Sequence, residues 1–362
     1  MLVAEDPEGD ADWWAMCVRQ ADHLVCVANA DQPALTTAPL GRAETDLVLV
    51  GKSTSEVIRA WSAGICPWKV TLTDGTDIAT DVRALAARIA GRSVGVVMAG
   101  GGARAFAHIG VLHELTEQGI AVDRVAGASV GSIIAALWAS GRTPQEVEDI
   151  VYSEMVRGRP FSDFTLPVAS VAKGKRVERS LHRYFGDLTI EELPRRFVCM
   201  STDLQSRKPY PLRHGPVGNA VMASVALPGL FPPRRDGQRL LADGGILDNL
   251  PVGLLTDRDE GPVLAVNIGM GGGGSPRSSD GPGAAAAAPR PVRIPALGET
   301  LMRTIFIGSG GAVEAAREAG AVVVTPSTMG VGLLEFHQID RMIESGRAAA
   351  RAVLDEPGNG LR

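Results

Sequence analysis

The chain has 362 residues and a formal net charge of −5, from 36 Lys and Arg against 41 Asp and Glu. A mildly acidic chain lacks the basic surplus that neutralises phosphates, so it is a poor candidate for nucleic-acid binding. Hydrophobic residues make up 45% and charged residues 21%, which excludes a chain that is disordered throughout. The length fits two domains of ordinary size or one large α/β domain with an extension.

The cysteines and the first residues bear on the cell compartment. The four cysteines are far apart and form no Cys-x-x-Cys pair, so we expect neither a disulfide framework nor a zinc site. The start, MLVAEDPEGDADWW, is acidic where a secretory signal is basic and then apolar. No window holds 18 uncharged apolar residues. These patterns predict a cytoplasmic protein without bound metal, for which any membrane contact is peripheral.

The first ninety residues alternate short apolar runs with segments of helical spacing. Strands are predicted at His23–Asn29, Asp46–Val50 and Trp68–Leu72, and helices at 54–63 and 77–90. No linker precedes the strand at 94–98. We therefore expect residues 1–92 to be an α/β extension packed on a domain of residues 93–362, with strands added to the sheet of that domain.

The alternation is stronger from residue 93 onward. Further strands are predicted at 94–98, 122–125, 196–201, 238–241, 263–268 and 321–324, and helices at 105–119, 130–141, 176–185, 218–225, 297–319 and 335–353. This order predicts a mostly parallel sheet covered by helices on both faces. Residues 271–291, GGGGSPRSSDGPGAAAAAPRP, lack periodicity and are interpreted as a flexible insertion. A mobile lid is the alternative, less favoured because the segment has no large apolar side chain.

Three consecutive glycines, Gly100, Gly101 and Gly102, separate a predicted strand from a helix and precede Arg104. Such a turn lets a ligand approach the backbone, and amides at a helix start attract negative charge. The turn could bind a dinucleotide pyrophosphate, a nucleotide phosphate or the oxyanion of an acyl-transfer intermediate. The alternative is a tight turn without a ligand. Asp123 begins the second strand instead of ending it, which argues against a dinucleotide site. No Gly-Lys-Ser/Thr follows a glycine at P-loop spacing.

The second motif is a G-x-S-x-G formed by Gly127, Ser129 and Gly131. A predicted strand enters it and an amphipathic helix leaves it, which is the setting of a nucleophile elbow. The serine hydroxyl would then lie at the positive end of the helix. The motif therefore predicts that Ser129 is a nucleophile.

A serine nucleophile needs a base. None of the six histidines has the local signature of a catalytic base. A better candidate is Asp243, which a predicted strand delivers to a Gly244-Gly245 turn. The alternative interpretation is an ordinary Asp-Gly turn.

Taken together, these segments resemble the patatin-like phospholipase family. The resemblance rests on GGGARAFAHIGVL, GASVGS, ASVALPGLFPP and DGGILDNLPV, in that order, and extends from about residue 94 to the C-terminus. The stretch QADHLVCVAN and the helix before residue 94 are similar to the neuropathy-target-esterase-like, bacterial lysophospholipase subgroup. The resemblance implies a three-layer α/β/α fold with a mostly parallel central sheet, and a (lyso)phospholipid whose carboxylic ester is hydrolysed.

The resemblance also implies roles for particular residues. It implies a Ser–Asp dyad of Ser129 and Asp243, an oxyanion hole from Gly100, Gly101, Gly102 and Arg104, and no metal or organic cofactor. The sequence departs from the family pattern at two further positions. Ala105 stands where the family usually has Gly, which would restrict the loop if that residue needs positive φ. Asp248 stands where the family usually has Asn, and it would raise the pKa of Asp243 if the carboxylates are close.

Two alternatives to the Ser–Asp esterase remain. One is a Ser-His-Asp esterase that uses His214 or His337, and the other is a catalytically weak lipid-binding module. Residues 161–172 are apolar and aromatic and adjoin the basic segment 173–183, a combination that suits an acyl chain and an anionic headgroup. An ordinary helix with a solvated basic face explains the same pattern.

Overall fold

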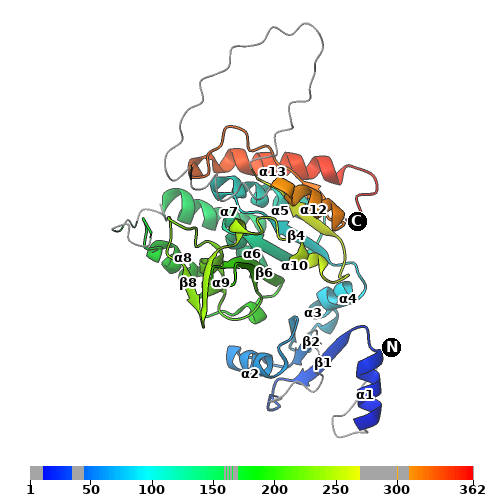
Figure 1. The fold of residues 1–362 in the computed structure, drawn as a ribbon. Coiled ribbons are helices and arrows are strands. Elements are labelled where there is room, and N and C mark those ends of the chain that lie inside the picture. The colour runs from blue at the N-terminus through cyan, green and yellow to red at the C-terminus, as the bar shows by residue number, and fades with distance from the viewer. Residues whose placement is uncertain are drawn as a thin grey trace, which may run out of the picture. The chain divides into compact units, whose positions relative to one another are not determined.

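The computed structural model describes residues 11–34, 45–158, 160, 163, 165, 170–269, 300 and 310–361 (Figure 1). The chain divides into an N-terminal unit, Met1–Arg92 with Glu191–Pro194, and a C-terminal unit, Ser93–Ile190 with Arg195–Arg362. The insertion predicted at 271–291 lies outside the described residues.

The N-terminal unit has its own sheet and core. Its described elements are α1 (Ala11–Gln20), β1 (Leu24–Asn29), β2 (Thr45–Val50), α2 (Ser55–Ile65), β3 (Val70–Thr73), α3 (Ile78–Asp81) and α4 (Arg83–Ile89). In the described chain, β1, β2 and β3 form one parallel sheet in that order. Leu47 and Leu49 of β2 pack in one core cluster with Trp61 of α2.

The expectation that these strands extend the sheet of the following domain is wrong. Their described pairings are with one another only. The physical reason lies in β2, whose side chains are almost all buried and whose two edges are taken by β1 and β3. The apolar runs therefore complete a small sheet of their own.

The C-terminal unit is built on a larger sheet, called the main sheet. Its strand order in the described residues is β11-β10-β4-β5-β6-β9-β8, and β7 pairs with β6 beside this path. The strands are β4 (Val94–Met98), β5 (Val122–Ala128), β6 (Arg196–Asp203), β7 (Lys208–Leu212), β8 (Arg234–Asp236), β9 (Arg239–Asp243), β10 (Val263–Val266) and β11 (Val322–Val324). The pairs from β11 to β6 are parallel, and those of β7, β8 and β9 are antiparallel.

Helices flank the main sheet (Figure 1). They are α5 (Ala107–Glu117), α6 (Val130–Ala139), α7 (Pro144–Val151), α8 (Lys175–Phe185), α9 (Val217–Ser224), α10 (Gly253–Thr256), α12 (Ala312–Glu318) and α13 (Ile339–Leu354). Short 3-10 turns are η1 (Gly102–Phe106), η3 (Ile190–Glu192), η4 (Gly244–Ile246) and η6 (Phe336–Gln338), and η2 (Tyr152–Arg157) is a π-helical segment. The predicted α/β fold with a mostly parallel central sheet flanked by helices is confirmed.

The register of the main sheet determines where the motif residues meet. Because β4 and β5 are parallel neighbours, the glycine loop after β4 and Ser129 after β5 emerge at the same edge. Ala128, the last residue of β5, lies opposite Met200 of β6. The next residue of β6, Ser201, lies opposite Asp243 at the end of β9. Ser129 and Asp243 are thus at one level on either side of β6.

Candidate active site

Ser129 lies on a strained turn between β5 and α6. Its backbone has φ 50° and ψ −131°, a conformation that is costly for a residue with a side chain and that clusters at functional sites. The flanking glycines are required by space. A Cβ on Gly127 would lie 2.7 Å from the backbone of Gly131, and a Cβ on Gly131 would lie 2.3 Å from the Met98 carbonyl oxygen. The G-x-S-x-G spacing therefore reflects close backbone contacts around the serine.

The Ser129 hydroxyl donates a hydrogen bond to Asp243, with 2.6 Å between Oγ and Oδ2. The other carboxylate oxygen, Oδ1, accepts the Gly245 amide at 2.8 Å. Gly244 permits the turn, because a Cβ there would lie 2.2 Å from the Met200 carbonyl oxygen. The Asp243 side chain is fully buried and Ser129 is 8% exposed. The structure thus brings together the serine and the aspartate that the motifs single out.

The environment of Asp243 changes its acidity. Burial raises the pKa of Asp243 to about 6. The hydrogen bonds from Ser129 and the Gly245 amide act in the opposite direction and lower the pKa, but burial is the larger effect. Asp248 does not contribute to this shift, so the expected influence of a second carboxylate is not the cause. Burial also raises the pKa of Asp248 itself.

The three glycines of the loop after β4 have different environments. The Gly100 amide donates to the Asn249 carbonyl oxygen at 3.2 Å. For the amides of Gly101 and Gly102, the described part of the chain offers no hydrogen-bond acceptor. Gly102 has φ 56°, and a Cβ there would lie 2.1 Å from the Leu333 carbonyl oxygen. The loop therefore presents the backbone amides of Gly101 and Gly102 as two hydrogen-bond donors, and position 102 can hold only glycine.

Arg104 and Ala105 follow the glycines in η1. The Arg104 amide donates to the Gly101 carbonyl oxygen at 3.2 Å, and its Nε donates to the Val331 carbonyl oxygen at 2.8 Å. Arg104 thus ties the loop to the segment before η6. Ala105 is fully buried in η1 and is not among the described non-glycine residues with positive φ. Its methyl group therefore does not restrict the loop.

Two polar residues of the site were not singled out by the sequence analysis. Ser224, at the end of α9, accepts the Ser129 amide at 3.1 Å and donates to the Met200 carbonyl oxygen at 2.6 Å. Asn249 donates from Nδ2 to the Gly100 carbonyl oxygen at 3.0 Å, while its buried Oδ1 has no hydrogen-bond partner in the described structure. Ser224 lies in the segment ASVALPGLFPP and Asn249 in DGGILDNLPV, two of the segments that carry the family resemblance. Their place in these segments is the feature of the sequence that could have identified them.

The histidines proposed for a triad lie elsewhere. His214 and His337 are exposed, and His337 shares a hydrogen bond with its neighbour Gln338. His108 is fully buried but bonds the Ala99 carbonyl oxygen. The Ser129 hydroxyl is instead bonded to Asp243. This geometry favours the dyad over the triad.

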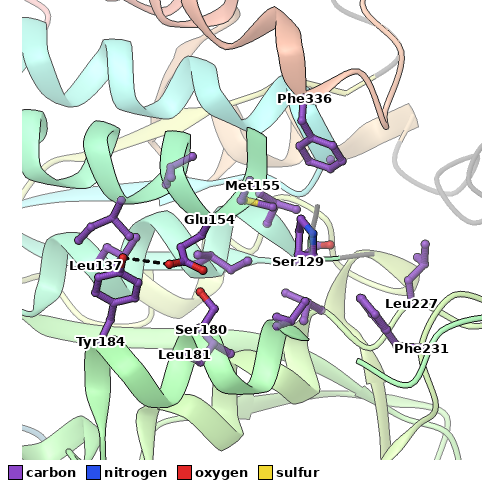
Figure 2. A pocket seen from close by; sticks show the side chains of 18 of the residues that line it. Ser129, Leu137, Glu154, Met155, Ser180, Leu181, Tyr184, Leu227, Phe231 and Phe336 are labelled. Atoms are coloured by element: carbon purple, nitrogen blue, oxygen red, sulfur yellow. Dashed lines mark hydrogen bonds between the residues drawn. The ribbon is translucent and has the colours of Figure 1, made fainter. Parts of the chain in front are cut away.

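Within the C-terminal unit, Ser129 lines an apolar cavity (Figure 2). Its empty space is about 810 Å³, a volume that includes space open to solvent. Leucine, isoleucine, valine, methionine and phenylalanine side chains dominate its lining. Among the described lining residues, the polar side chains are those of Ser129, Glu154, Ser180 and Tyr184. The serine therefore opens on a space suited to hydrocarbon.

The described residues hold no group of three or more His, Cys, Asp or Glu side chains arranged for a metal ion. In the same residues, no helix has both the length and the apolar character needed to cross a bilayer.

Residues 96–256 match the family model of the patatin-like phospholipases. An uncharacterized NTE family protein of Mycobacterium tuberculosis (strain H37Rv) is 38% identical over 279 residues, which are 75% of this chain and 48% of that protein. Lysophospholipase nte1 of Aspergillus fumigatus is 33% identical over 294 residues, 76% of this chain and 19% of that protein. The chain thus spans about half or less of the length of these relatives. VipD from Legionella pneumophila, a solved structure, aligns with 73% of this chain and 67% of its own at 15% identity, with a TM-score of 0.39.

Proposed function

The chain belongs to the patatin-like phospholipase family through residues 96–256, and we propose that it is a serine acyl hydrolase that cleaves a carboxylic ester of a lysophospholipid or phospholipid. The observation that carries the proposal is the 2.6 Å hydrogen bond from Ser129 to the buried carboxylate of Asp243. The apolar cavity beside that bond supports a substrate with a fatty-acyl chain.

In the first half of the reaction, Asp243 accepts the Ser129 proton while Oγ attacks the ester carbonyl carbon. The tetrahedral intermediate then collapses, the leaving alcohol oxygen takes the proton from Asp243, and the acyl group stays on Ser129. In the second half, Asp243 deprotonates a water molecule that attacks the acyl-enzyme, and the Ser129 oxygen leaves and regains the proton. The fatty acid departs and the dyad returns to its starting state.

The negative charge that forms on the carbonyl oxygen needs fixed donors. The amides of Gly101 and Gly102 suit this role because they lack an acceptor in the described structure. The Val130 amide, in the first turn of α6, is a third donor of the same kind. Removing one such donor from an acyl-transfer site costs about 3–4 kcal/mol of transition-state stabilisation. Gly100 contributes by holding the loop to Asn249.

A carboxylate is a weak base, and its surroundings compensate for this. The raised pKa of about 6 at Asp243 makes the carboxylate about a hundredfold more basic than an ordinary aspartate. Full burial of Asp243 also keeps bulk water from competing with the Ser129 hydroxyl for the carboxylate. The dyad can therefore work without a histidine.

A fluorophosphonate probe tests the nucleophile. We expect wild-type protein to be labelled and to hydrolyse p-nitrophenyl butanoate and lysophosphatidylcholine, and Ser129→Ala to do neither. Asp243→Asn removes the base and is expected to lower the hydrolysis rate at least about a hundredfold. Ser140→Ala, at the other end of α6 where its hydroxyl bonds the Leu137 carbonyl oxygen, is the matched control. Labelling of Ser129→Ala would reject the proposal, and lipid binding without hydrolysis would favour a binding module.

A further inference from the structure

The apolar cavity follows α6 from its beginning to its end. Val130, Ile133 and Leu137 line it at helical spacing and thus form one face of the helix. Ser129 stands immediately before the helix and Tyr184 lies near its other end. Arg142, three residues past the last residue of α6, donates to the Tyr184 carbonyl oxygen at 3.1 Å and lies 5.8 Å from the centre of its ring. The cavity therefore runs the length of α6.

Polar side chains interrupt the apolar lining at the end away from Ser129. The Tyr184 hydroxyl donates to Glu154 Oε1 at 3.1 Å, and Figure 2 shows this hydrogen bond on the opposite side of the cavity from Ser129. Arg183 forms an ion pair with the same carboxylate, and the Arg183 side chain is 64% exposed against 17% for Glu154. The cluster of Glu154, Tyr184 and Arg183, called the distal cluster, thus links the cavity to the outer surface.

Local structure places Glu154 at this position. It lies in the π-helical segment η2 (Tyr152–Arg157), and π-helical turns are rare and occur frequently at functional sites. Met155 of the same segment also lines the cavity. From the opposite side, α8 presents Val177, Ser180, Leu181 and Tyr184 on one face. The distal cluster is therefore formed by the elements that enclose the cavity.

We propose that the cavity is a channel for one fatty-acyl chain and that the distal cluster limits the length of that chain. This inference rests on the proposed function. A hydrocarbon end that reaches Glu154 would have to separate the carboxylate from its donors or bury it against methylene groups, and both are unfavourable.

The length of α6 gives the expected limit. From Val130 to Leu137 the helix rises about 10 Å, and over its whole length about 15 Å, at ~1.5 Å per residue. An extended chain advances ~1.2 Å per bond, because three backbone bonds span at most ~3.6 Å. An acyl chain attached to Ser129 therefore reaches the distal cluster after about 8 to 12 carbons.

The inference is tested with p-nitrophenyl esters of 4, 8, 12 and 16 carbons, each kcat/KM divided by that of the butanoyl ester. For wild type we expect the ratio to rise by up to about fourfold per added methylene and then to fall beyond about 12 carbons. The double variant Glu154→Leu with Tyr184→Phe replaces the polar groups by apolar ones of similar size. In it we expect the ratio of the 16-carbon to the 8-carbon ester to increase at least tenfold.

Two controls isolate the polarity of the cluster. Glu154→Gln keeps an acceptor for Tyr184 but loses the ion pair with Arg183, and its ratio of the 16-carbon to the 8-carbon ester should increase less than that of the double variant. Glu148→Ala removes a carboxylate of α7 that pairs with His113 outside the cavity, and it should leave the profile unchanged. A wild-type ratio that still rises at 16 carbons overturns the inference, as does a wild-type profile in the double variant. If wild type hydrolyses no butanoyl ester in a Ser129-dependent manner, the proposed function fails instead.

Discussion

At the scale of single residues, the site depends on a carboxylate kept away from water. Asp243 is fully buried, and its hydrogen bonds come from one hydroxyl and one backbone amide. A carboxylate that has a cationic partner normally keeps a low pKa. At Asp243 no cation is among the causes of the shift, and burial raises the pKa to about 6. The residue therefore gains basicity from the same burial that makes its charge costly.

This shift predicts the pH dependence of hydrolysis. Asp243 must be ionised to accept a proton, so kcat/KM should fall about tenfold per pH unit below about pH 6 and be level above it. The measurement is kcat/KM for p-nitrophenyl butanoate between pH 4 and 9.

A histidine base would give a similar midpoint, so variants are needed beside the pH profile. His214→Gln and His337→Gln, both at exposed positions, are expected to keep the rate and the midpoint of wild type. If either variant no longer showed the fall in kcat/KM below about pH 6, the assignment of Asp243 as the base would be contradicted. A rate that stays level down to pH 4 would show that its pKa is not raised.

At the scale of elements, a close contact at two glycines joins α5 and α13, the helices that follow the glycine loop and η6. A Cβ on Gly110 of α5 would lie 1.9 Å from the Ile343 carbonyl oxygen, and a Cβ on Gly346 of α13 would lie 1.9 Å from that of Ala107. The two backbones therefore touch directly. Helix α5 follows the glycine loop, and α13 follows η6, whose Phe336 lines the cavity. Their contact fixes both segments around Ser129.

We expect Gly346→Ala to force these helices apart. Overpacking of this kind typically costs about 1–3 kcal/mol, and here the neighbour is a backbone carbonyl that cannot rotate away. The unfolding midpoint in urea should fall, and kcat/KM should fall with it because the glycine loop shifts. Gly253→Ala is the matched control, since beyond its chain neighbours and its own helix no atom lies within 4 Å of the added Cβ in α10, and the alanine should not lower the midpoint. Equal midpoints for the two variants would contradict the close contact.

Elements also show where prediction from the sequence ends. Ser129 and Asp243 were predictable because each sits at the end of a strand in a short local motif. Their hydrogen bond depends on the register of β6 between β5 and β9, which no local pattern encodes. Asn249 is a similar case, because its contact with Gly100 joins residues 149 apart. The π-helical geometry of η2 has no periodicity in the sequence that distinguishes it from an α-helix.

At the scale of the whole molecule, the candidate chemistry is confined to the C-terminal unit. Ser129, Asp243, the glycine loop and the described lining of the cavity all belong to it. The N-terminal unit has its own sheet and its own buried cluster. The strands of residues 24–73 were recognisable from their apolar runs, but a strand pattern does not specify which sheet the strand joins. We therefore propose that the N-terminal unit is a module whose core is energetically separate from the site.

Leu49→Ala tests this separation. Leu49 is fully buried in β2, and such a truncation costs about 2–5 kcal/mol, so the N-terminal unit should become susceptible to proteolysis at lower urea. Fluorophosphonate labelling of Ser129 without denaturant should keep the wild-type rate, because no residue of the dyad or the glycine loop belongs to that unit. Leu264→Ala is the matched truncation in the main sheet, where Leu264 is fully buried in β10. It should lower the urea concentration at which labelling is lost. If Leu49→Ala lowers that concentration equally, the two cores unfold together and the module is not separate.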